Sequence, residues 1–329
     1  MGPSFRRALA FLLLTGSAVW AVGAAASAQG PSRTVVELRV EGVVDPFIAD
    51  HVESGIAVAQ DQGAAAVLRS IDTPGGLDSS MRQITQAILN ARIPVIGYVS
   101  PEGARAASAG TFILLSCHVA AMAPATNVGA AHPVGVSGAI ESEKAENDAA
   151  EYIRGLAERR GRNMDWAESA VRESESATAT EALELDVIDL IEPDVPALFA
   201  ALDGRTVEVA GGRTVTLDLA GATVDQRGLG LLAGLLHALL DPNIAFILFY
   251  LGLIALYFEF TNPGLTVPGV LGVIMLIGAF IAFGVLPVQL AGVLLLVASA
   301  VFFVIEVAAP GVGVALAGGV TTLILGGLF

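Results

Sequence analysis

The sequence is almost devoid of lysine. Lys144 is the only lysine among 329 residues, whereas sixteen arginines supply the rest of the basic charge. The two side chains differ chemically, because an arginine in a protein does not lose its proton and a lysine can. Lys144, in the stretch GAIESEKAENDAA (138–150), therefore raises the question of whether its position requires a lysine.

Cysteine is equally scarce, since Cys117 is the only one in the chain. A single cysteine excludes an intramolecular disulfide. Cys117 lies in the apolar run FILLSCHVAAMAP, where a cysteine ordinarily packs as a small hydrophobic side chain. We therefore expect a buried Cys117 and do not assign it as a nucleophile.

Lysine and arginine are absent from the C-terminal third of the chain. From Gly228 to Phe329 the only formal charges are Asp241, Glu259 and Glu306. This composition predicts a transmembrane domain over 228–329, because charged side chains at bilayer depth are costly. Nearly all of the net charge of −15 therefore lies before this domain. An acidic segment of this kind argues against nucleic-acid binding.

The N-terminus has the three parts of a secretory signal peptide. Arg6 and Arg7 form a basic region, residues 8–23 are apolar, and Ala26-Ser27-Ala28 is a small-residue cleavage site. We assign residues 1–28 to a signal peptide, with an uncleaved anchor helix as the alternative. Either interpretation predicts that the segment from residue 29 onward is exported.

Within the predicted domain 29–227, residues 33–227 alternate between short β-branched runs and apolar residues at helical spacing. Such alternation predicts an α/β domain with a mostly parallel sheet. We expect strands at 34–44, 65–72, 93–100 and 118–124, a tight turn at 73–76, and helices at 46–63, 77–91, 103–116, 145–160 and 164–173. Further along, we expect a helix, turn and strand over 178–191, a hairpin over 206–219 and a link over 220–227.

The predicted transmembrane domain contains an internal sequence repeat. Hydropathy predicts three complete spans at 244–260, 268–286 and 288–305, and a fourth that starts near Gly313. FEFTNPGLTVPG and IEVAAPGVGVAL each place a glutamate before Pro-Gly, so that Glu259 and Glu306 lie 47 residues apart. Each glutamate either ends a helix at the membrane interface or has a paired role inside the membrane. The ending LILGGLF leads us to expect a truncated chain.

Two segments that follow strands suggest a catalytic site. Ser108 lies in ARAASAGTF, a run of small residues that opens an apolar helix, and TPGG contains Gly75 and Gly76. Both follow predicted strands, so they meet at the carboxyl edge of the sheet. Backbone N–H groups of Gly76 or Gly75, together with that of Ala109, would form an oxyanion hole for a Ser108 nucleophile. The structural alternative is a serine that packs within a helix.

A serine nucleophile needs a general base, and two residues compete for this role. His132 lies in the loop GAAHPVG, and Lys144 begins the next predicted helix. A lysine acts as a base only when its surroundings favour the neutral amine. Glu141, Glu143 and Glu146 flank Lys144 and favour the charged amine, which suits a solvated helix face.

Four ordered segments resemble a known family. IDTPGG, PVIGYVSPEGARAASAGTFI, AMAPATNVGAAHPV and EALELDVIDLI are together similar to the NfeD proteins, membrane-bound relatives of the ClpP and signal-peptide-peptidase-A serine proteases. The similarity covers residues 33–220, and the spans that follow fit the long form of the family. It implies a ClpP/crotonase-like ββα superhelix followed by an all-α transmembrane domain.

The resemblance also implies roles for individual residues. The family uses a Ser–Lys dyad, whose serine falls on Ser108 and whose lysine falls on Lys144, with oxyanion donors at Gly75, Gly76 and Ala109. In ClpP a His–Asp pair serves instead, and its histidine falls near His132. Because no aspartate partner is evident, we rank His132 as the second choice of base. The dyad leads us to expect neither a metal nor an organic cofactor.

The resemblance further implies a setting for the protein. We expect a multi-pass protein of the cell membrane, with an extracytoplasmic protease domain, that forms a homodimer or higher oligomer. Its expected substrates are apolar segments of stomatin-like membrane proteins. The alternatives are a non-catalytic scaffold for such a partner and, less consistent with export, an acyl-CoA enzyme on the same fold. The long form usually ends in a small domain of the OB type, which we expect to be missing here.

Overall fold

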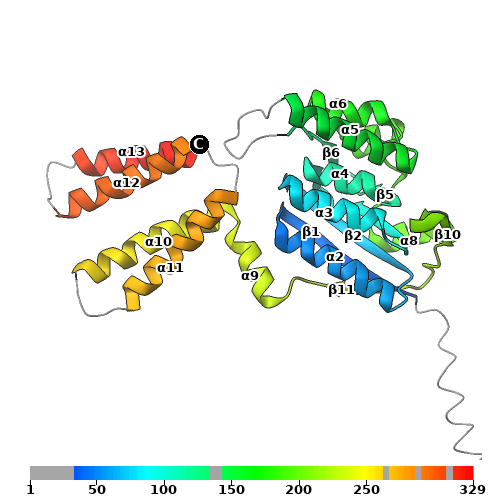
Figure 1. Ribbon diagram of the computed structural model, residues 1–329, viewed down its shortest axis with the longest axis horizontal. Coiled ribbons are helices and arrows are strands. Elements are labelled where there is room, and N and C mark those ends of the chain that lie inside the picture. The colour runs from blue at the N-terminus through cyan, green and yellow to red at the C-terminus, as the bar shows by residue number, and fades with distance from the viewer. Residues whose placement is uncertain (1–32, 134–142, 262–266, 286–289, 309–313, 329) are drawn as a thin grey trace, which may run out of the picture.

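The computed structural model describes residues 33–133, 143–261, 267–285, 290–308 and 314–328. They form an α/β domain followed by long helices that extend away from it as two hairpins (Figure 1). The predicted signal peptide and Glu141 lie outside the described residues.

The first half of the α/β domain alternates strands and helices, as expected. Its elements are β1 (Thr34–Val44), α2 (Pro46–Asp61), β2 (Ala66–Gly76), α3 (Asp78–Leu89), β3 (Val95–Val99), β4 (Arg105–Ala107), α4 (Ala109–Ser116), β5 (Val119–Met122) and β6 (Asn127–Gly129). Helix α2 has a favourable N-terminus: the Asp45 side chain caps it by accepting a hydrogen bond from the Ile48 N–H, and a proline occupies the first helical position.

The second half contributes the remaining helices of the domain and four more strand pairings. Its elements are α5 (Glu143–Arg160), α6 (Met164–Arg172), β7 (Ser176–Thr178), α7 (Ala179–Glu184), β8 (Leu190–Ile191), α8 (Val195–Leu202), β9 (Thr206–Val209), β10 (Arg213–Thr216) and β11 (Thr223–Arg227). Strands β9 and β10 form the predicted hairpin, with Gly211 at a positive φ of 78° in the connection.

Strand β2 organises the sheet. It pairs in parallel with β1 on one side and with β3 on the other, and near its end Thr73 pairs with Ala106 of β4. The strand order is β7-β6-β4-β2-β3-β5-β8, and off this path β1 pairs with β2 and β11 pairs with β1. Only β6 and β7 pair antiparallel within this described sheet. The pairing of β2 with β4 brings the glycines after Thr73 next to the segment that carries Ser108.

Helices cover both faces of the sheet. On one face, a large core joins the sheet to α2, α3, α4, α5 and α6, and includes Leu38, Ile71 and Ile113. On the other face, Leu68 and Ile96 pack against α8 and the β9–β10 hairpin. Adjacent residues of a strand point to opposite faces, which explains why β2 needs apolar residues along most of its length.

Three predictions about local structure were wrong. Residues 73–76 are not a tight turn, because β2 continues to Gly76 and pairs Gly75 with Val43 and Gly76 with Val44. Residues 220–227 are not a simple link, because β11 lies in parallel register with the start of β1. The helix predicted over 103–116 begins only at Ala109, because residues 105–107 form β4. The short strands β6 and β7 were also missed, since three-residue strands carry too little periodicity to detect.

The C-terminal region consists of apolar helices. They are α9 (Leu231–Leu239), α10 (Pro242–Thr261), α11 (Val267–Val285), α12 (Leu290–Ala308) and α13 (Val314–Leu328). By length and composition, one stretch within the described residues, Asn243–Thr261, can cross a membrane, and the stretches in the other three long helices are shorter. The helices match the predicted spans in position, and the number of complete crossings stays a prediction.

The sequence repeat has a structural counterpart. The return helices α11 and α13 begin at residues that are spaced like Glu259 and Glu306. The Glu306 carboxylate accepts a hydrogen bond of 3.2 Å from the Leu316 N–H in the first turn of α13. The Glu259 side chain packs against Gly269 at the equivalent position of α11. Both contacts give the glutamates a structural role, because an anion stabilises a helix N-terminus.

A histidine–aspartate pair joins the two regions. His237 of α9 lies 2.6 Å (Nδ1 to Oδ2) from Asp45, which is fully buried at the corner between β1 and α2. Val43 and Phe47 from the same corner pack against the helical core that contains Ala245 and Phe249. The corner therefore contacts the membrane region directly, and it also pairs with the end of β2.

The pair predicts a pH-dependent attachment of α9. The hydrogen bond with Asp45 raises the pKa of His237 above its ordinary value. The stabilisation is therefore fully present below about pH 6.5 and is lost as the pH rises through the raised pKa.

A hydrogen bond to a charged group contributes about 1.5–3 kcal/mol. At about pH 6, the α9 amides of the unaltered protein should exchange at least about tenfold more slowly than those of His237→Gln. The two proteins should exchange equally near pH 9, and an equal difference at both pH values would contradict this prediction.

Candidate active site

Ser108 lies at the junction of β4 and α4, where the backbone is strained. It precedes the first residue of α4 and has φ 51° and ψ −116°. A residue other than glycine in such a conformation costs about 1–3 kcal/mol and persists only where the surroundings enforce it. Strained residues of this kind cluster at functional sites, and the sharp strand-to-helix turn presents the Ser108 side chain at the end of the sheet.

Hydrogen bonds from both sides hold the strained turn. The Ser108 N–H donates to the Gly129 carbonyl at 3.0 Å, and the Ser108 carbonyl accepts from the Thr111 N–H at 2.9 Å. The Thr111 hydroxyl reaches back to the carbonyls of Ala106 and Gly129. Strands β4 and β6 and the first turn of α4 therefore fix the position of Ser108.

Gly75 approaches Ser108 so closely that no side chain fits. A Cβ on Gly75 would lie 2.7 Å from the Ser108 Cβ and 3.1 Å from its Oγ, and Gly75 has φ 117°. The Gly75 N–H donates to the Thr73 hydroxyl at 3.0 Å. Gly75 therefore borders the serine, but its N–H group is already engaged.

Gly76 and Ala109 offer the better-placed N–H groups. The Leu77 N–H donates to Val44 of β1, and successive amides of a strand point to opposite sides, so the Gly76 N–H points away from β1. Ala109 is the first residue of α4, and N–H groups in the first turn of a helix lack intrahelical partners. The helix dipole adds a favourable field for a developing negative charge.

Ser108, Gly76 and Ala109 line one pocket of about 340 Å³. Its remaining walls come from α3, α4 and α5 and from the chain after β6: Asp78, Met81, Arg82, Phe112, Ala131, Pro133, Ala145, Asp148 and Ala149. The structure thus brings together the two sequence segments that were expected to meet at the carboxyl edge of the sheet.

Lys144 lies on the first turn of α5, beside this pocket. The next residue, Ala145, lines the pocket, as do Asp148 and Ala149 one turn later. The Lys144 side chain is exposed and forms no hydrogen bond or ion pair with the described residues. The helix that carries Lys144 therefore borders Ser108, while Lys144 itself is exposed to solvent.

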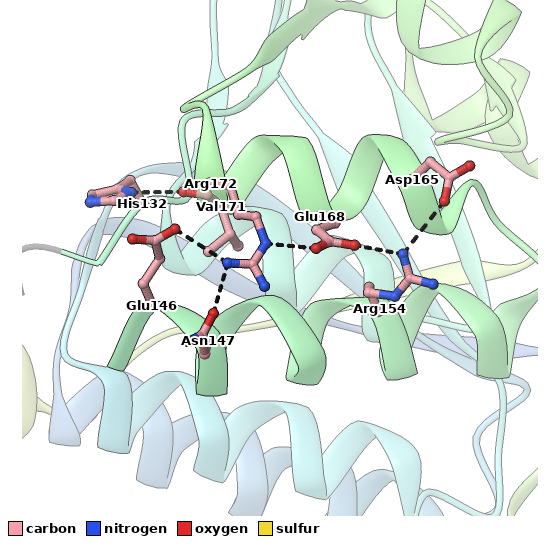
Figure 2. A network of polar contacts seen from close by, with 8 residues as sticks. All are labelled: His132, Glu146, Asn147, Arg154, Asp165, Glu168, Val171 and Arg172. Atoms are coloured by element: carbon pink, nitrogen blue, oxygen red, sulfur yellow. Dashed lines mark hydrogen bonds and ion pairs between the residues drawn. The ribbon is translucent and has the colours of Figure 1, made fainter. Parts of the chain in front are cut away.

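His132 is held away from the pocket by α6. Its Nδ1 lies 2.8 Å from the Val171 carbonyl, to which it donates as the N–H form (Figure 2). His132 is absent from the described lining of the pocket, whereas its neighbours Ala131 and Pro133 are part of it.

The other two histidines of the α/β domain contact the backbone away from the pocket. His118 is buried and accepts a hydrogen bond from the Val95 N–H, and burial next to Arg160 and Arg162 lowers its pKa to about 3. His51 is partly buried and contacts the Arg227 carbonyl. Neither histidine lines the pocket with Ser108.

Two further expectations concern cysteine and metals. Cys117 is buried as predicted, and burial raises the pKa of its thiol, which disfavours the reactive thiolate. Within the described part of the chain, no group of three or more His, Cys, Asp or Glu side chains is arranged to hold a metal ion.

The sequence reasoning missed the charged rim of the pocket. Arg82 of α3 pairs with Asp78 one turn earlier at 2.9 Å and with Asp148 of α5. The spacing of Asp78 and Arg82 just after Gly76 was a usable signal, because residues four apart share a helix face. The contact with Asp148 was not predictable, since it depends on the packing of α3 beside α5.

Models of two protein domains match the chain. The model described as "NfeD1b, N-terminal domain" matches residues 34–193, and the "NfeD integral membrane domain" matches residues 243–329. The "Membrane-bound protease PH1510" of Pyrococcus horikoshii is 36% identical over 296 residues, which cover 88% of this chain and 67% of that protein. The "Membrane protein NfeD1b" of Bacillus subtilis is 27% identical over 293 residues, covering 88% of this chain and 65% of that protein. The chain thus spans about two thirds of the length of either relative.

Solved structures of one relative match the α/β domain. The "1510-N membrane-bound stomatin-specific protease", solved as a lysine-to-alanine mutant in complex with a substrate peptide, gives a TM-score of 0.60 at 32% identity. This match covers 64% of our chain and 98% of the other. A serine-to-alanine mutant of the same protease gives 0.58 at 34% identity, with 61% and 100% covered. The predicted fold class, a ClpP-like α/β domain followed by helices, is confirmed.

Proposed function

Because the chain belongs to the NfeD family of membrane proteins, we propose that it is a membrane-anchored serine endopeptidase. In this proposal Ser108 is the nucleophile and Lys144 is the general base. Gly76 and Ala109 donate to the oxyanion, and Gly75 leaves room for the serine rather than acting as a donor.

The reaction proceeds through an acyl-enzyme. The neutral Lys144 amine takes the proton of Ser108 as its Oγ attacks the peptide carbonyl carbon. The oxyanion of the tetrahedral intermediate accepts hydrogen bonds from the Gly76 and Ala109 N–H groups. The C–N bond then breaks, the leaving amine takes the proton from Lys144, and water hydrolyses the ester with Lys144 as the base again.

One observation carries the proposal: the strained Ser108 lies in a pocket with Gly76, Ala109 and the first turns of α5. The related protease was studied as a serine and a lysine mutant, which supports a role for both residue types. Lys144 is the sole lysine of this chain. His132 remains the second choice of base, and its bond to Val171 weighs against it.

The pocket and the membrane region support a proposal for the substrate class. Met81 and Phe112 are among the residues that line the pocket, and the membrane domain keeps the site near the bilayer. The related protease is named as specific for stomatin. We propose that this protein cleaves apolar segments of stomatin-like membrane proteins, and that it works as a dimer or higher oligomer.

The proposed topology follows from composition. Residues 29–227 form the protease domain, and residues 228–329 form a multi-pass transmembrane domain. The N-terminal signal peptide directs the protease domain to the extracytoplasmic side. The turns after Glu259 and Glu306 then lie on the opposite side, because the helix ends next to them lie far from the α/β domain (Figure 1).

Peptide cleavage by the full chain tests the proposal. The purified protein in lipid nanodiscs should cleave a peptide that copies the apolar C-terminal segment of a stomatin-like protein, with products identified by mass spectrometry. A polar peptide of equal length is the control and should remain intact. A protein that binds the stomatin-like partner and cleaves none of its apolar segments would be a scaffold, and the proposal would be wrong.

The contact between Gly75 and Ser108 predicts a loss of activity. Gly75→Ala forces the new Cβ against Ser108, so kcat/KM should fall about 100-fold, as for a small misplacement of a reacting group. Gly103→Ala is a matched control, because Gly103 also has a positive φ, 86°, but an added Cβ there would meet only open space. Both variants should lose about 1–3 kcal/mol of stability. Full activity of Gly75→Ala would show that Ser108 does not need this position.

A further inference from the structure

Lys144 is surrounded by acidic residues, which is unfavourable for a base. On its own helix Glu143, Glu146 and Asp148 lie within about one turn of it. A nearby carboxylate stabilises the protonated amine, which cannot accept a proton from serine. The proposed function therefore requires that these carboxylates be neutralised or turned away.

Arg82 binds the carboxylate that shares a face with Lys144. Asp148 lies four residues after Lys144, so the two side chains lie on one side of α5. The Asp148 carboxylate forms an ion pair with the Arg82 Nη2 from α3. The Arg82 guanidinium also stacks 4.5 Å from the ring centre of Tyr152, one turn further along α5. A single arginine thus anchors α5 at two successive turns beside the pocket.

Arg172 binds the second carboxylate from the opposite side. Its Nη1 lies 3.4 Å from Glu146 and 2.8 Å from the Asn147 amide oxygen, and its Nε lies 2.6 Å from Glu168. Figure 2 shows Glu146 and Asn147 of α5 directed toward Arg172 of α6. Glu146 therefore points to α6 rather than to the pocket.

Within the described residues, the other charged groups near this turn have partners or are exposed. Asp78 of α3 is paired with Arg82, and Glu168 of α6 is shared between Arg172 and Arg154. Glu143 is exposed, so water and salt screen its charge. Helix α4, which also packs against α5, has no charged side chain, and His132 is bonded to Val171.

We propose that Arg82 and Arg172 are positioning residues for the base: Arg82 binds Asp148, the carboxylate that would otherwise pair with the Lys144 amine, Arg172 holds the Glu146 carboxylate on the α6 side, and together they fix the first turns of α5 beside Ser108. This inference rests on the proposed function, because it concerns the base of that same site. Exposed ion pairs contribute little to stability, about 0–1 kcal/mol each, so their removal should affect the reaction more than the fold.

The pH dependence of kcat/KM tests the inference in the full chain in nanodiscs, with the apolar peptide as the substrate. In Arg82→Gln and Arg172→Gln, the acid limb should move to higher pH by about half a unit or more, since a freed carboxylate favours the protonated amine. Arg154→Gln is the matched control, because Arg154 lies further along α5 and binds Glu168 and Asp165 of α6. Its acid limb should stay in place, and KM should remain similar in all three variants.

Two further variants separate charge from structure. Asp148→Asn leaves the Arg82 cation near Lys144 without its carboxylate, so the acid limb should move to lower pH. In the double variant with Arg82→Gln and Asp148→Asn, the acid limb should return most of the way to its original pH, although the ion pair remains lost. A merely structural role predicts the same loss in both single variants and no recovery in the double variant.

The outcomes distinguish this inference from the proposed function. If cleavage depends on Lys144 but neither Arg82→Gln nor Arg172→Gln moves the acid limb, the inference is wrong and the proposed dyad stands. If Lys144→Arg cleaves as well as the unaltered protein, the proposed base is wrong and the inference fails with it.

Discussion

Ser108→Ala should lower kcat/KM for the apolar peptide by about 10⁴-fold or more. The loss is this large because no other group in the pocket can form the acyl-enzyme. The pocket contains Asp78 and Asp148, but both carboxylates are paired with Arg82. The measurement is the initial rate of product formation, followed by mass spectrometry.

Ser116→Ala is the control for this change. Ser116 lies at the other end of α4, and its hydroxyl donates to the Ile113 carbonyl at 2.7 Å. Its removal should cost about 0.5–1.5 kcal/mol of stability and leave the cleavage rate unchanged. Cleavage that survives in Ser108→Ala, with the same products, would exclude Ser108 as the nucleophile.

Lys144→Arg should lower kcat/KM by about 10³-fold or more, although it preserves the charge. The arginine cannot take the proton of Ser108, and this distinguishes a general base from a residue that only binds an anionic group. Lys144→Ala should be equally inactive, and a small primary amine in the buffer should restore part of its rate. The measurement is the rate of peptide cleavage with increasing amine concentration.

His132→Ala provides the comparison for the base. Its ring is tied to the Val171 carbonyl, so its removal should reduce the rate only modestly through lost packing. The opposite result, in which Lys144→Arg stays active and His132→Ala does not, would move the role of base to His132.

Much of the fold could be predicted because its signals are local. The helix of α2 follows from its apolar spacing and its Asp45 cap, and β1 follows from a run of β-branched residues. The turn assigned to 73–76 failed because two glycines suggested a turn, whereas pairing with Val43 and Val44 extends β2 through them. The link predicted over 220–227 was wrong for a similar reason, since TVDQR becomes the strand β11 only by pairing with β1.

The site was partly predictable for a similar reason. Ser108 and Gly76 were each predicted to follow a strand. A parallel sheet places such residues at the same edge, whatever its exact strand order. The fate of the glutamates around Lys144 was not predictable, because it depends on α3 and α6 packing beside α5. Arg172 and Glu146 lie far apart in the chain, and only the fold makes them neighbours.

Covalent labelling tests the central claim, that Lys144 activates Ser108, most directly. The full chain in nanodiscs is treated with an apolar peptide that carries a β-lactone, which acylates an activated serine, and the modified residue is identified by mass spectrometry. The account predicts a single adduct on Ser108 in the unaltered protein and almost none in Lys144→Arg. An adduct on another residue, or equally fast labelling of Ser108 in Lys144→Arg, would contradict it.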